Sequence, residues 1–260
     1  MIFGVIVAGG VGMRLGADRP KQFLDLNGKP IIMHTLQTFL ECDRLDQIYM
    51  GVHPEWMQHM GELVRQYVTE DEQKRVHLVP GGSERNDTIM NVIGQIEADF
   101  GTKEPHYIIT QDGVRPFVSQ RLIKKHVEAV IAYDAVNTAI PAVDTIMVSM
   151  DGETISDIPE RKYLYQSQTP QSFRMDLLKK LYTELSEEEK SILTDACKIC
   201  TVRGVTVHMV MGEVTNMKIT TAADFEIAKI IARTCSTLQA SAAAVSSETP
   251  SRTKKRVSSS

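Results

Sequence analysis

The chain predicts an α/β fold in which a mainly parallel sheet is covered by helices on both faces. Two observations lead to this prediction. Apolar runs of strand length alternate with segments of helical periodicity, and a glycine-rich loop follows directly on the first apolar run. Sheets of this kind bind ligands beyond the carboxyl ends of their strands, so we expect a functional site in the loops that follow strands.

The first half of the chain supplies strands and helices in alternation. Strands are expected over residues 2–7, 47–52, 75–79 and 106–110. Helices are expected over residues 54–69, 87–98 and 119–133.

The alternation of strand-like and helical segments ends near Ala135. Residues 136–169 are rich in Val, Ile, Thr and Tyr, with Asp151-Gly152 as a turn signal, and predict a projecting β-rich arm. An arm that does not bury its own apolar face packs on a partner, and a second copy of the chain is the simplest partner. We therefore expect a homodimer formed through this arm.

The end of the chain changes in composition. Before that change, further helices are expected over residues 175–185, 187–199 and 222–233, and a further strand over 205–211. From Ser236 the chain is rich in Ser, Ala and Thr, with a basic cluster over residues 252–256, and this composition predicts disorder. We therefore expect one domain over residues 1–235 and a solvated tail over 236–260, with a tether to an anionic surface as the less favoured interpretation.

Composition excludes several classes of partner. The net charge of −4 gives no reason to expect binding to nucleic acid or to a membrane surface. The sequence has no run of 18 apolar residues and no basic leader, so we expect neither a membrane span nor secretion. Four cysteines do not make a disulfide framework in 260 residues, and the pair Cys197-x-x-Cys200 is interpreted as two thiols on one helix face rather than a zinc or redox site. The expected location is the reducing cytoplasm.

A glycine-rich loop is the strongest functional signal. It reads Ala8-Gly9-Gly10-Val11-Gly12-Met13-Arg14-Leu15-Gly16, and Lys21 follows seven residues after Arg14. Because this loop has few side chains, its backbone N–H groups can approach a polyphosphate closely. Arg14 and Lys21 can then neutralise the negative charge of the polyphosphate. The loop does not match a P-loop, because Lys21 does not occupy the lysine position of the Gly-x-x-x-x-Gly-Lys-Ser/Thr motif. It does not match the dinucleotide-binding motif Gly-x-Gly-x-x-Gly either, because the last glycine position is Leu15. The loop therefore predicts a nucleoside triphosphate site, with a tight turn after a strand as the alternative.

This loop and the following Pro20-Lys21-Gln22-Phe23-Leu24 resemble the sugar-phosphate nucleotidyltransferases. The Pro-Lys-Gln portion is similar to the cytidylyltransferases that act on methylerythritol phosphate or ribitol phosphate. The resemblance spans residues 1–233 and implies a Rossmann-like three-layer fold and a dimer formed through the arm. It also implies CTP and a polyol phosphate as substrates and Mg²⁺ as cofactor, with CTP contacts from Ala8, Gly9, Gly10 and Gly12.

The resemblance extends to two later segments. Residues 81–88 are similar to a Gly-Gly-x-x-Arg loop that lies over the nucleobase, which implies base contacts from Gly82, Ser83 and Thr88. Residues 216–220 are similar to an Asn-Ile-Lys-Val-Thr segment, which implies that Lys218 reaches the reacting phosphates.

A third segment carries the expected metal ligand. The family reads His-Asp-Ala-x-Arg-Pro where this chain has Gln111-Asp112-Gly113-Val114-Arg115-Pro116, so Gln111 and Gly113 depart from the pattern. Asp112 is kept and is expected to hold Mg²⁺, a hard cation that prefers oxygen ligands. Arg115 is expected either at the acceptor or in a structural ion pair.

The remaining assignments concern catalysis and the acceptor. Arg14, Lys21 and Lys218 are expected to surround the α-phosphate of CTP as its charge builds. The resemblance places Thr145 and Arg161 of the arm on the phosphate of the acceptor, contributed across the dimer. Thr169-Pro170-Gln171, a marker of the family, is interpreted as structural.

Finer resemblance decides between the two acceptors. Residues 88–91, 114–117, 165–173 and 194–199 look like the ribitol-5-phosphate enzymes of wall teichoic acid and capsule synthesis. Methylerythritol phosphate enzymes usually read Thr-Asp-Asp where this chain has Thr194-Asp195-Ala196. D-Ribitol 5-phosphate is therefore the expected acceptor and CDP-ribitol the product, with 2-C-methyl-D-erythritol 4-phosphate as the alternative. A nucleotide-binding protein without turnover and a dinucleotide oxidoreductase stay open as other classes.

Overall fold

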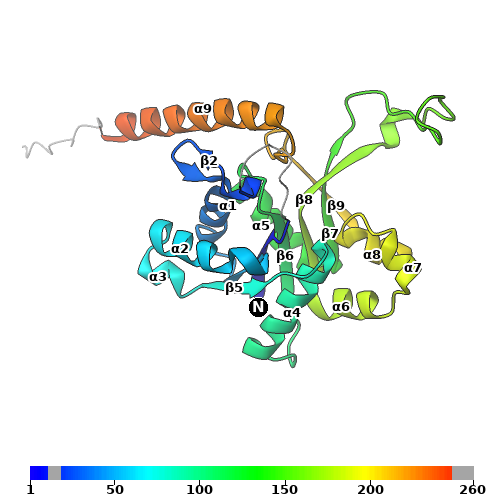
Figure 1. Ribbon diagram of the computed structural model, residues 1–260, viewed down its shortest axis with the longest axis horizontal. Coiled ribbons are helices and arrows are strands. Elements are labelled where there is room, and N and C mark those ends of the chain that lie inside the picture. Colours follow the sequence, from blue (N-terminus) through cyan, green and yellow to red (C-terminus); the bar gives the residue numbers. More distant parts are fainter. Residues whose placement is uncertain (11–18, 248–260) are drawn as a thin grey trace, which may run out of the picture.

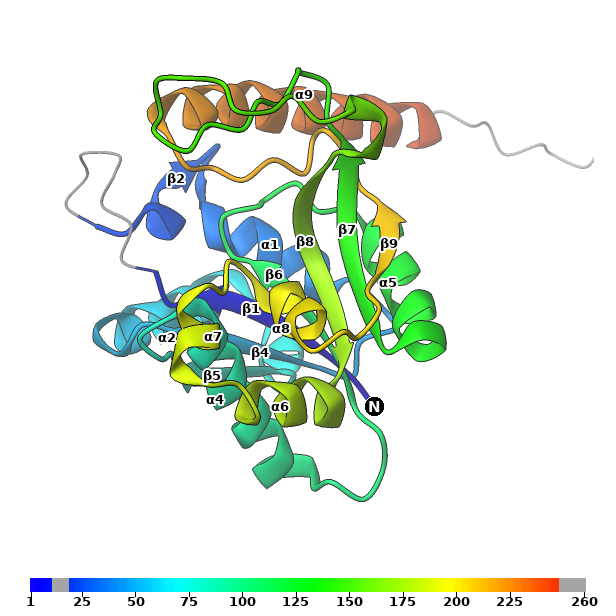
Figure 2. The same ribbon diagram turned by 90° about the vertical axis from the view of Figure 1, so that its right-hand side faces the viewer.

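The computed structural model of the chain describes residues 1–10 and 19–247, with side chains as far as residue 234. Its centre is a seven-stranded sheet in the order β5-β4-β1-β6-β8-β7-β9 (Figures 1 and 2). Four of the six neighbouring strand pairs in this sheet are parallel. Helices pack on both faces, so the predicted α/β fold with a mainly parallel sheet is confirmed.

The parallel half of the sheet is built from four apolar strands. They are β1 (Ile2–Ala8), β4 (Gln47–Val52), β5 (Val76–Pro80) and β6 (Tyr107–Asp112). β1 pairs with β4 on one side and with β6 on the other. The strand order therefore reverses at β1, and sheets of this kind bind ligands at such a reversal, beyond the carboxyl ends of the strands.

The other half of the sheet brings more loops to the same edge. It contains β8 (Tyr165–Arg174), β7 (Ala135–Pro141) and β9 (His208–Met211). β8 runs antiparallel to both β6 and β7, so β7 ends and β8 begins at the edge where β6 ends. β9 runs parallel to β7 and ends at this edge too. The segments after β1, β6, β7 and β9 therefore leave the sheet at one edge.

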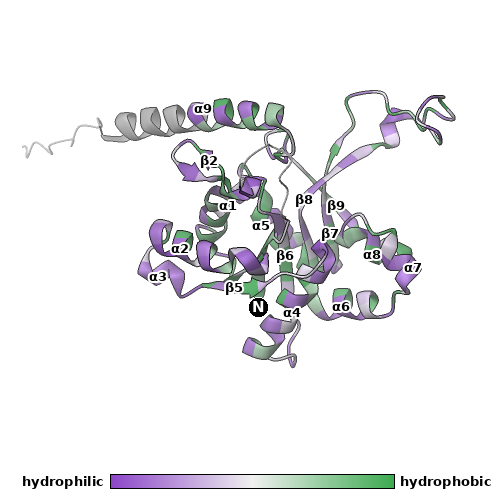
Figure 3. Cartoon of the chain, in the orientation of Figure 1, coloured by the Kyte–Doolittle hydropathy of each residue, from purple (hydrophilic) through white to green (hydrophobic). Residues whose placement is uncertain are grey.

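Strand side chains alternate between two cores. In β1, Phe3 and Val5 face one core while Ile6 and Ala8 face the other. The core around Ile6 is covered by α1 (Ile31–Leu40), α2 (Met57–Tyr67) and α5 (Gln120–Tyr133). The core around Phe3 is covered by α4 (Arg85–Phe100), α6 (Met175–Thr183) and α8 (Ala196–Val202). The helices carry both hydrophobic and hydrophilic residues, as expected for a layer between core and solvent (Figure 3).

Most predicted elements are found close to their expected positions. β4 occupies the predicted residues 47–52, and α5 begins directly after Ser119, whose hydroxyl accepts from the Leu122 N–H. Sequence analysis missed α1 and the short hairpin of β2 (Asp25–Leu26) and β3 (Lys29–Pro30). Asn27-Gly28 between these two strands is a hairpin signal that was available in the sequence.

The predicted single helix over residues 187–199 is two helices. α7 (Glu187–Ser191) ends before Asp195, and α8 begins after it. The Asp195 carboxylate accepts from the Lys198 N–H at 2.9 Å and therefore caps a new helix, where the sequence pattern had suggested continuity.

α9 (Ala222–Ser247) is longer than the predicted helix over residues 222–233. Its extension is rich in Ala, a strong helix former, and the backbone is helical from Ser236 to Ser247, where we expected disorder. Residues 248–260, with the basic cluster, lie outside the described residues. The division into a domain over 1–235 and a separate tail over 236–260 stays a prediction, and so does the disorder expected for residues 248–260. Within the described ranges, no helix is both long and apolar enough to span a membrane.

The segment between β7 and β8 differs from the β-rich arm that we predicted. The strands at the two ends of residues 136–169 belong to the central sheet. Residues 142–164, all of them described, contain an isolated bridge between Val148 and Asp157 and the short helix η3 (Arg161–Tyr163), and are otherwise irregular. Six apolar side chains of this projecting segment are more than half exposed: Val143, Met147, Met150, Ile155, Ile158 and Tyr163. The homodimer stays a prediction, and this is the surface that it is expected to bury.

The two cysteines of α8 are packed in the core. Cys197 and Cys200 are buried, and burial raises the pKa of Cys200 to about 11 and also raises the pKa of Cys197. Thiols that stay protonated are poor metal ligands and poor nucleophiles. The interpretation of two thiols on one helix face therefore fits better than a zinc or redox site.

A neutral histidine, His126 of α5, is buried against strands β7 and β8 of the sheet. His126 has no exposed surface, its Nε2 lies 2.7 Å from Thr138 Oγ1, and its Nδ1 lies 2.7 Å from Ser172 Oγ. The Thr138 hydroxyl donates to the Pro170 carbonyl at 2.7 Å, so it accepts from His126 Nε2–H, and Nδ1 accepts from Ser172. Burial lowers the pKa of His126 to about 3, so the ring is neutral in the folded protein.

This histidine predicts a loss of stability in acid. Between pH 6.5 and about 3 the unfolded chain binds a proton that the folded chain does not, so the free energy of unfolding falls by up to about 1.4 kcal/mol per pH unit. We expect His126→Gln to be less stable at pH 7 but to lose less stability between pH 7 and pH 5. Urea unfolding followed by circular dichroism at both pH values measures this, and equal losses in the two proteins would contradict it.

Candidate active site

A cleft of about 640 Å³ lies beyond the carboxyl ends of β1 and β6. It is therefore at the edge where the strand order predicts a ligand site. Seventeen residues from six separate segments line it: Val7, Ala8, Gly9, Gly10, Lys21, Gln22, Gly82, Ser83, Glu84, Arg85, Thr88, Asp112, Gly113, Val114, Thr194, Lys218 and Thr220.

The cleft brings together most of the residues that sequence analysis singled out. Nine of them line it: Ala8, Gly9, Gly10, Lys21, Gly82, Ser83, Thr88, Asp112 and Lys218. Gly12 and Arg14 lie outside the described residues. Thr145 and Arg161 do not line the cleft of this chain, and Arg115 is buried beside it.

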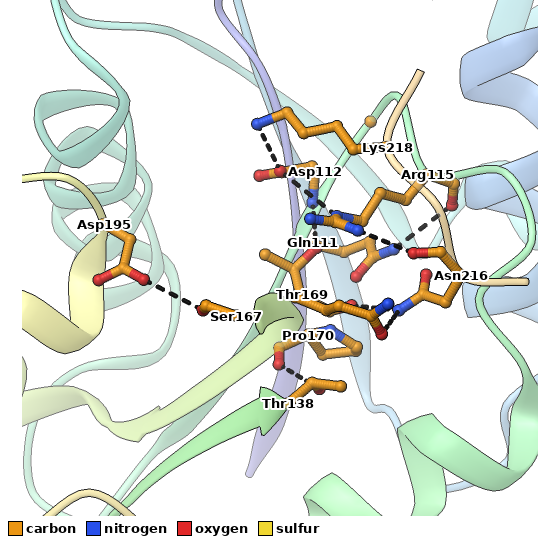
Figure 4. A network of polar contacts seen from close by, with 12 residues as sticks. Gln111, Asp112, Arg115, Thr138, Ser167, Thr169, Pro170, Asp195, Asn216 and Lys218 are labelled. Atoms are coloured by element: carbon orange, nitrogen blue, oxygen red, sulfur yellow. Dashed lines mark hydrogen bonds and ion pairs between the residues drawn. The ribbon is translucent and has the colours of Figure 1, made fainter. Parts of the chain in front are cut away.

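Three cations meet one carboxylate at the end of β6. The Asp112 Oδ1 lies 3.0 Å from Arg85 Nε. The Asp112 Oδ2 lies 2.9 Å from Lys218 Nζ and 3.6 Å from Arg115 Nε (Figure 4). Asp112 is buried, but the three positive charges hold the pKa of its carboxyl well below the usual range. The group of four side chains therefore carries two more positive charges than negative ones, and it favours an anionic ligand.

Arg115 has the position of a structural ion pair, one of the two roles that we considered. Its Nη1 donates to the Asn216 carbonyl at 2.8 Å, and its Nε faces Asp112 (Figure 4). The Asn216 side chain in turn donates to the Thr169 carbonyl at 2.6 Å and to Gln168 Oε1 at 3.2 Å. These bonds fix the segment that carries Lys218, two residues further on. Arg115 thus joins Asp112 to the Lys218 segment and does not project toward an acceptor.

The two residues that depart from the family pattern, Gln111 and Gly113, flank Asp112 in the sequence. Gln111 is fully buried, and its Nε2 lies 3.4 Å from the Arg115 carbonyl. Gly113 donates its N–H to the Val7 carbonyl at 3.0 Å, and a Cβ on Gly113 would lie 2.8 Å from Ile32 Cδ1. Glycine is therefore the residue that fits between β1 and α1 here.

A buried amide holds the start of the glycine-rich loop. The Gln22 Nε2 donates to the Ala8 carbonyl at 3.2 Å and to the Gly10 carbonyl at 2.9 Å, and the side chain is buried. In a trans peptide the N–H points opposite to the carbonyl. The bond to Ala8 therefore directs the Gly9 N–H away from Gln22 and fixes the orientation of this peptide in the cleft wall.

Thr88 packs three glycine-containing segments together. A Cβ on Gly51 would lie 2.3 Å from Thr88 Cγ2, and a Cβ on Gly9 would lie 3.0 Å from Thr88 Oγ1. The Thr88 hydroxyl accepts from the Gly82 N–H at 3.0 Å and donates to the Glu84 carbonyl at 3.1 Å. Two of the expected base-reading groups, the Thr88 hydroxyl and the Gly82 N–H, are thus bonded to each other. Their geometry suits holding the loop rather than reading a base edge directly.

Hydrogen bonds to the Asp87 carboxylate support the loop after β5. The Ser83 hydroxyl donates to the Asp87 carboxylate at 2.6 Å, and the Tyr182 hydroxyl donates to the same carboxylate at 2.5 Å. These hydrogen bonds lower the pKa of Asp87, so the carboxylate stays charged and keeps both donors. The Ser83 side chain is therefore engaged, and its backbone is the part of Ser83 that is left to face a ligand.

Eight residues of the cleft were not predicted as site residues, among them Arg85, Gln22 and Thr194. Arg85 and Gln22 stood in the quoted segments without an assigned role, and Thr194, directly before the cap of α8, was quoted only for the acceptor. The Arg85 Nη2 is buried and, within the described ranges, has no hydrogen-bond partner. The arginine of the Gly-Gly-x-x-Arg pattern was the available signal for Arg85. No local pattern identifies Gln22, because its partners lie 12 and 14 residues away.

The residues around Asp112 do not fit a resident Mg²⁺ ion. Both carboxylate oxygens are engaged by cations, which repel a divalent ion. In the part of the chain that the structure describes, no three His, Cys, Asp or Glu side chains are grouped to hold a metal. The assignment of Asp112 as a metal ligand is therefore at odds with its surroundings in this structure.

Comparison with known proteins identifies the family of the chain. The family model "IspD: 2-C-methyl-D-erythritol 4-phosphate cytidylyltransferase" matches residues 2–234. A solved 4-diphosphocytidyl-2C-methyl-D-erythritol synthase from Anaerococcus prevotii is 25% identical, with a TM-score of 0.72 over 89% of this chain and 96% of that one. The 2-C-methyl-D-erythritol 4-phosphate cytidylyltransferase of Francisella tularensis is also 25% identical, with a TM-score of 0.72 over 87% of this chain and 97% of that one. The enzyme of that name from Thermus thermophilus is 24% identical, with a TM-score of 0.67 over 90% and 100% of the two chains. The chain therefore belongs to the IspD family of cytidylyltransferases.

Proposed function

We propose that this cytidylyltransferase transfers the cytidylyl group of CTP to the phosphate of a polyol phosphate and releases pyrophosphate. The observation that carries the proposal is the cation cluster at the ends of β1 and β6, where Arg85, Arg115 and Lys218 surround Asp112 beside a glycine-rich wall. This arrangement suits a polyanionic substrate, and the family supplies the reaction class.

The chemistry needs charge neutralisation more than proton transfer. A phosphate oxygen of the acceptor attacks the α-phosphorus of CTP in line, and pyrophosphate leaves. The attacking oxygen is already anionic, so the reaction requires no strong general base. The barrier comes from the approach of one anion to another, and it is lowered by positioning and by fixed cations.

The cations divide into those that face the cleft and those that support it. Lys21 and Lys218 line the cleft and are assigned to the α-phosphate, together with Arg14, which lies outside the described residues. Arg85 lines the cleft with a buried Nη2 that suits a phosphate oxygen. Ala8, Gly9, Gly10 and, by resemblance, Gly12 are assigned to the triphosphate through their backbone.

The base is assigned to the loop after β5. Gly82 and Ser83 line the cleft, while Thr88 holds the loop in place. A backbone carbonyl accepts a hydrogen bond from the exocyclic amine of cytosine, and uracil has an oxygen in that place. Preference for CTP over UTP is therefore assigned to the backbone of this loop.

Enzymes of this family generally use a divalent metal. The described surroundings of Asp112 do not fit a resident ion, so the roles above are assigned without one. For the acceptor, Thr145 and Arg161 of the projecting segment stay assigned to its phosphate, contributed by a second copy. Arg161 is exposed, and its Nη1 donates to the Val143 carbonyl at 2.9 Å.

The comparisons support 2-C-methyl-D-erythritol 4-phosphate as the acceptor better than D-ribitol 5-phosphate, our first expectation. The family description and the solved structures named above all refer to methylerythritol. One observation favours ribitol 5-phosphate as the second candidate. Methylerythritol phosphate enzymes usually have Asp at the position of Ala196, which is fully buried here and follows two residues after Thr194 of the cleft lining.

Pyrophosphate release with CTP and each acceptor in turn tests the proposed function. Preference for 2-C-methyl-D-erythritol 4-phosphate would support a role in isoprenoid synthesis, and preference for D-ribitol 5-phosphate would support CDP-ribitol formation for cell-wall polymers. UTP serves as the control nucleotide and should be a poor substrate. Binding of CTP without release of pyrophosphate with either acceptor would contradict both assignments.

Lys218 is expected to matter for turnover. Lys218→Met keeps the length of the side chain but removes a positive charge from the phosphate region, so we expect kcat to fall about a hundredfold to a thousandfold. Lys229→Met is the matched control, because Lys229 pairs with Glu226 on the surface of α9. Steady-state kinetics measures both variants, and near-normal turnover of Lys218→Met would show that this assignment is wrong.

Gln22 is expected to act on CTP binding through the backbone. Gln22→Met leaves the Ala8 and Gly10 carbonyls without their donor, and two lost hydrogen bonds amount to about 1–3 kcal/mol. We expect KM for CTP to rise about tenfold or more, while KM for the acceptor stays within about twofold. In the control Gln120→Met, a side-chain bond to the Thr38 carbonyl is lost between two residues that do not line the cleft, and KM for CTP should not change. Equal rises in both KM values for Gln22→Met would indicate general distortion instead.

A further inference from the structure

The four side chains around Asp112 differ in how much they are exposed. The side chains of Asp112 and Arg115 are 9% and 10% exposed, and that of Arg85 is 22% exposed, whereas that of Lys218 is 42% exposed. Lysine carries a compact charge on a flexible stem, while the planar guanidinium of arginine is fixed by several donors at once. Lys218 is therefore the cation of this group that can change its partner.

Departure of Lys218 would not leave Asp112 unpaired. The Arg85 Nε stays 3.0 Å from Oδ1. The Arg115 Nε is buried without a hydrogen-bond partner among the described residues and lies 3.6 Å from Oδ2, the oxygen that Lys218 occupies. Arg115 is thus placed to close onto Oδ2 when Lys218 leaves. The cost of a buried unpaired carboxylate is avoided in both states.

The same arrangement argues against Asp112 as a ligand of a divalent ion. Further hydrogen bonds hold both arginines near the carboxylate: Arg85 Nη1 donates to Gln171 Oε1 at 3.5 Å, and Arg115 Nη1 donates to the Asn216 carbonyl at 2.8 Å. A metal ion at Asp112 would have to displace or lie beside these buried charges. A triphosphate meets no such obstacle, because it is attracted by the excess of positive charge.

We propose that Asp112 is a holding carboxylate, which keeps the Lys218 ammonium over the cleft until a triphosphate binds, and that Arg85 and Arg115 keep Asp112 paired once Lys218 has moved to the phosphates. In this arrangement Asp112 competes with the substrate for Lys218. Before CTP binds, Asp112 holds the Lys218 ammonium at the cleft, so that Lys218 is already oriented toward the phosphates when CTP enters. The same ion pair slightly lowers the affinity for CTP. The proposal rests on the proposed function in taking CTP as the triphosphate.

Calorimetric binding of CTP, in EDTA and then in Mg²⁺, tests this role without turnover. In Asp112→Asn the competing carboxylate is gone, so we expect metal-free CTP to bind about threefold tighter or more. The factor by which Mg²⁺ improves CTP affinity should be the same as in the unmodified chain. Loss of the Mg²⁺ effect would identify Asp112 as a metal ligand, and unchanged or weaker metal-free binding would overturn the competition. Either result contradicts the proposal.

A control separates this local effect from a change of net charge. Asp134→Asn removes one negative charge in the same way, from the ion pair with Arg174 at the far edge of the sheet. Asp134 has a left-handed backbone with φ of 62°, which Asn also accepts. Metal-free CTP affinity should stay within about twofold in this variant. A gain equal to that of Asp112→Asn would assign the effect to net charge and overturn the proposal.

A crystal structure of the unmodified chain with tripolyphosphate keeps the test independent of folding in the variants. We expect Lys218 Nζ to leave Asp112 for a phosphate oxygen, and Arg115 Nε to move within hydrogen-bond distance of Oδ2. Lys218 still bonded to Asp112 would contradict the proposal, as would Mg²⁺ bound to Asp112 in a complex with CTP. Failure of the proposed function has a different signature, namely binding as expected but no pyrophosphate release with either acceptor.

Discussion

The cleft depends on one ion-paired carboxylate. Arg85, Arg115 and Lys218 come from α4, from the turn after β6 and from the segment after β9, and their charges repel one another. Asp112, at the end of a central strand, provides the negative charge that allows these three segments to meet. The burial of this carboxylate strengthens each pairing, because the local dielectric constant is low. A site for a polyanion is thus assembled around a single anion of the protein.

The backbone near this cluster depends on close packing of small residues. Thr88 of α4 lies against Gly9, Gly51 and Gly82, and a side chain on Gly51 would collide with it. The end of β4 and the loops after β1 and β5 are therefore packed against one side chain. Gln22 adds a second restraint, since it holds two carbonyls of the glycine-rich loop at once. The positions of the backbone groups in the cleft wall are fixed by packing before any substrate binds.

The sequence predicted the fold and the place of the site better than it predicted the partners within the site. The alternation of apolar runs and helical patterns is local, and so is the glycine-rich loop after β1, and both lead to the correct sheet edge. The contacts of Arg115 with Asn216 and of Arg85 with Asp112 join residues 101 and 27 positions apart, and no local pattern contains this information. The secondary structure within the projecting segment was predicted less accurately, for a related reason. Its β-branched residues predict strands, but strands need partners, and the sheet provides these only at the two ends of the segment.

The direction of β8 has a consequence for how the molecule is handled and oriented. Because β8 runs against β6, the projecting segment and the cleft share one rim of the sheet, and the chain starts at the opposite rim (Figure 2). A label, a surface or a fused domain attached at Met1 therefore faces away from both. When the molecule is immobilised by that end, the cleft and the exposed apolar side chains of the projecting segment face the solution together. A partner bound to the projecting segment then lies on the same side of the sheet as the entrance used by small molecules.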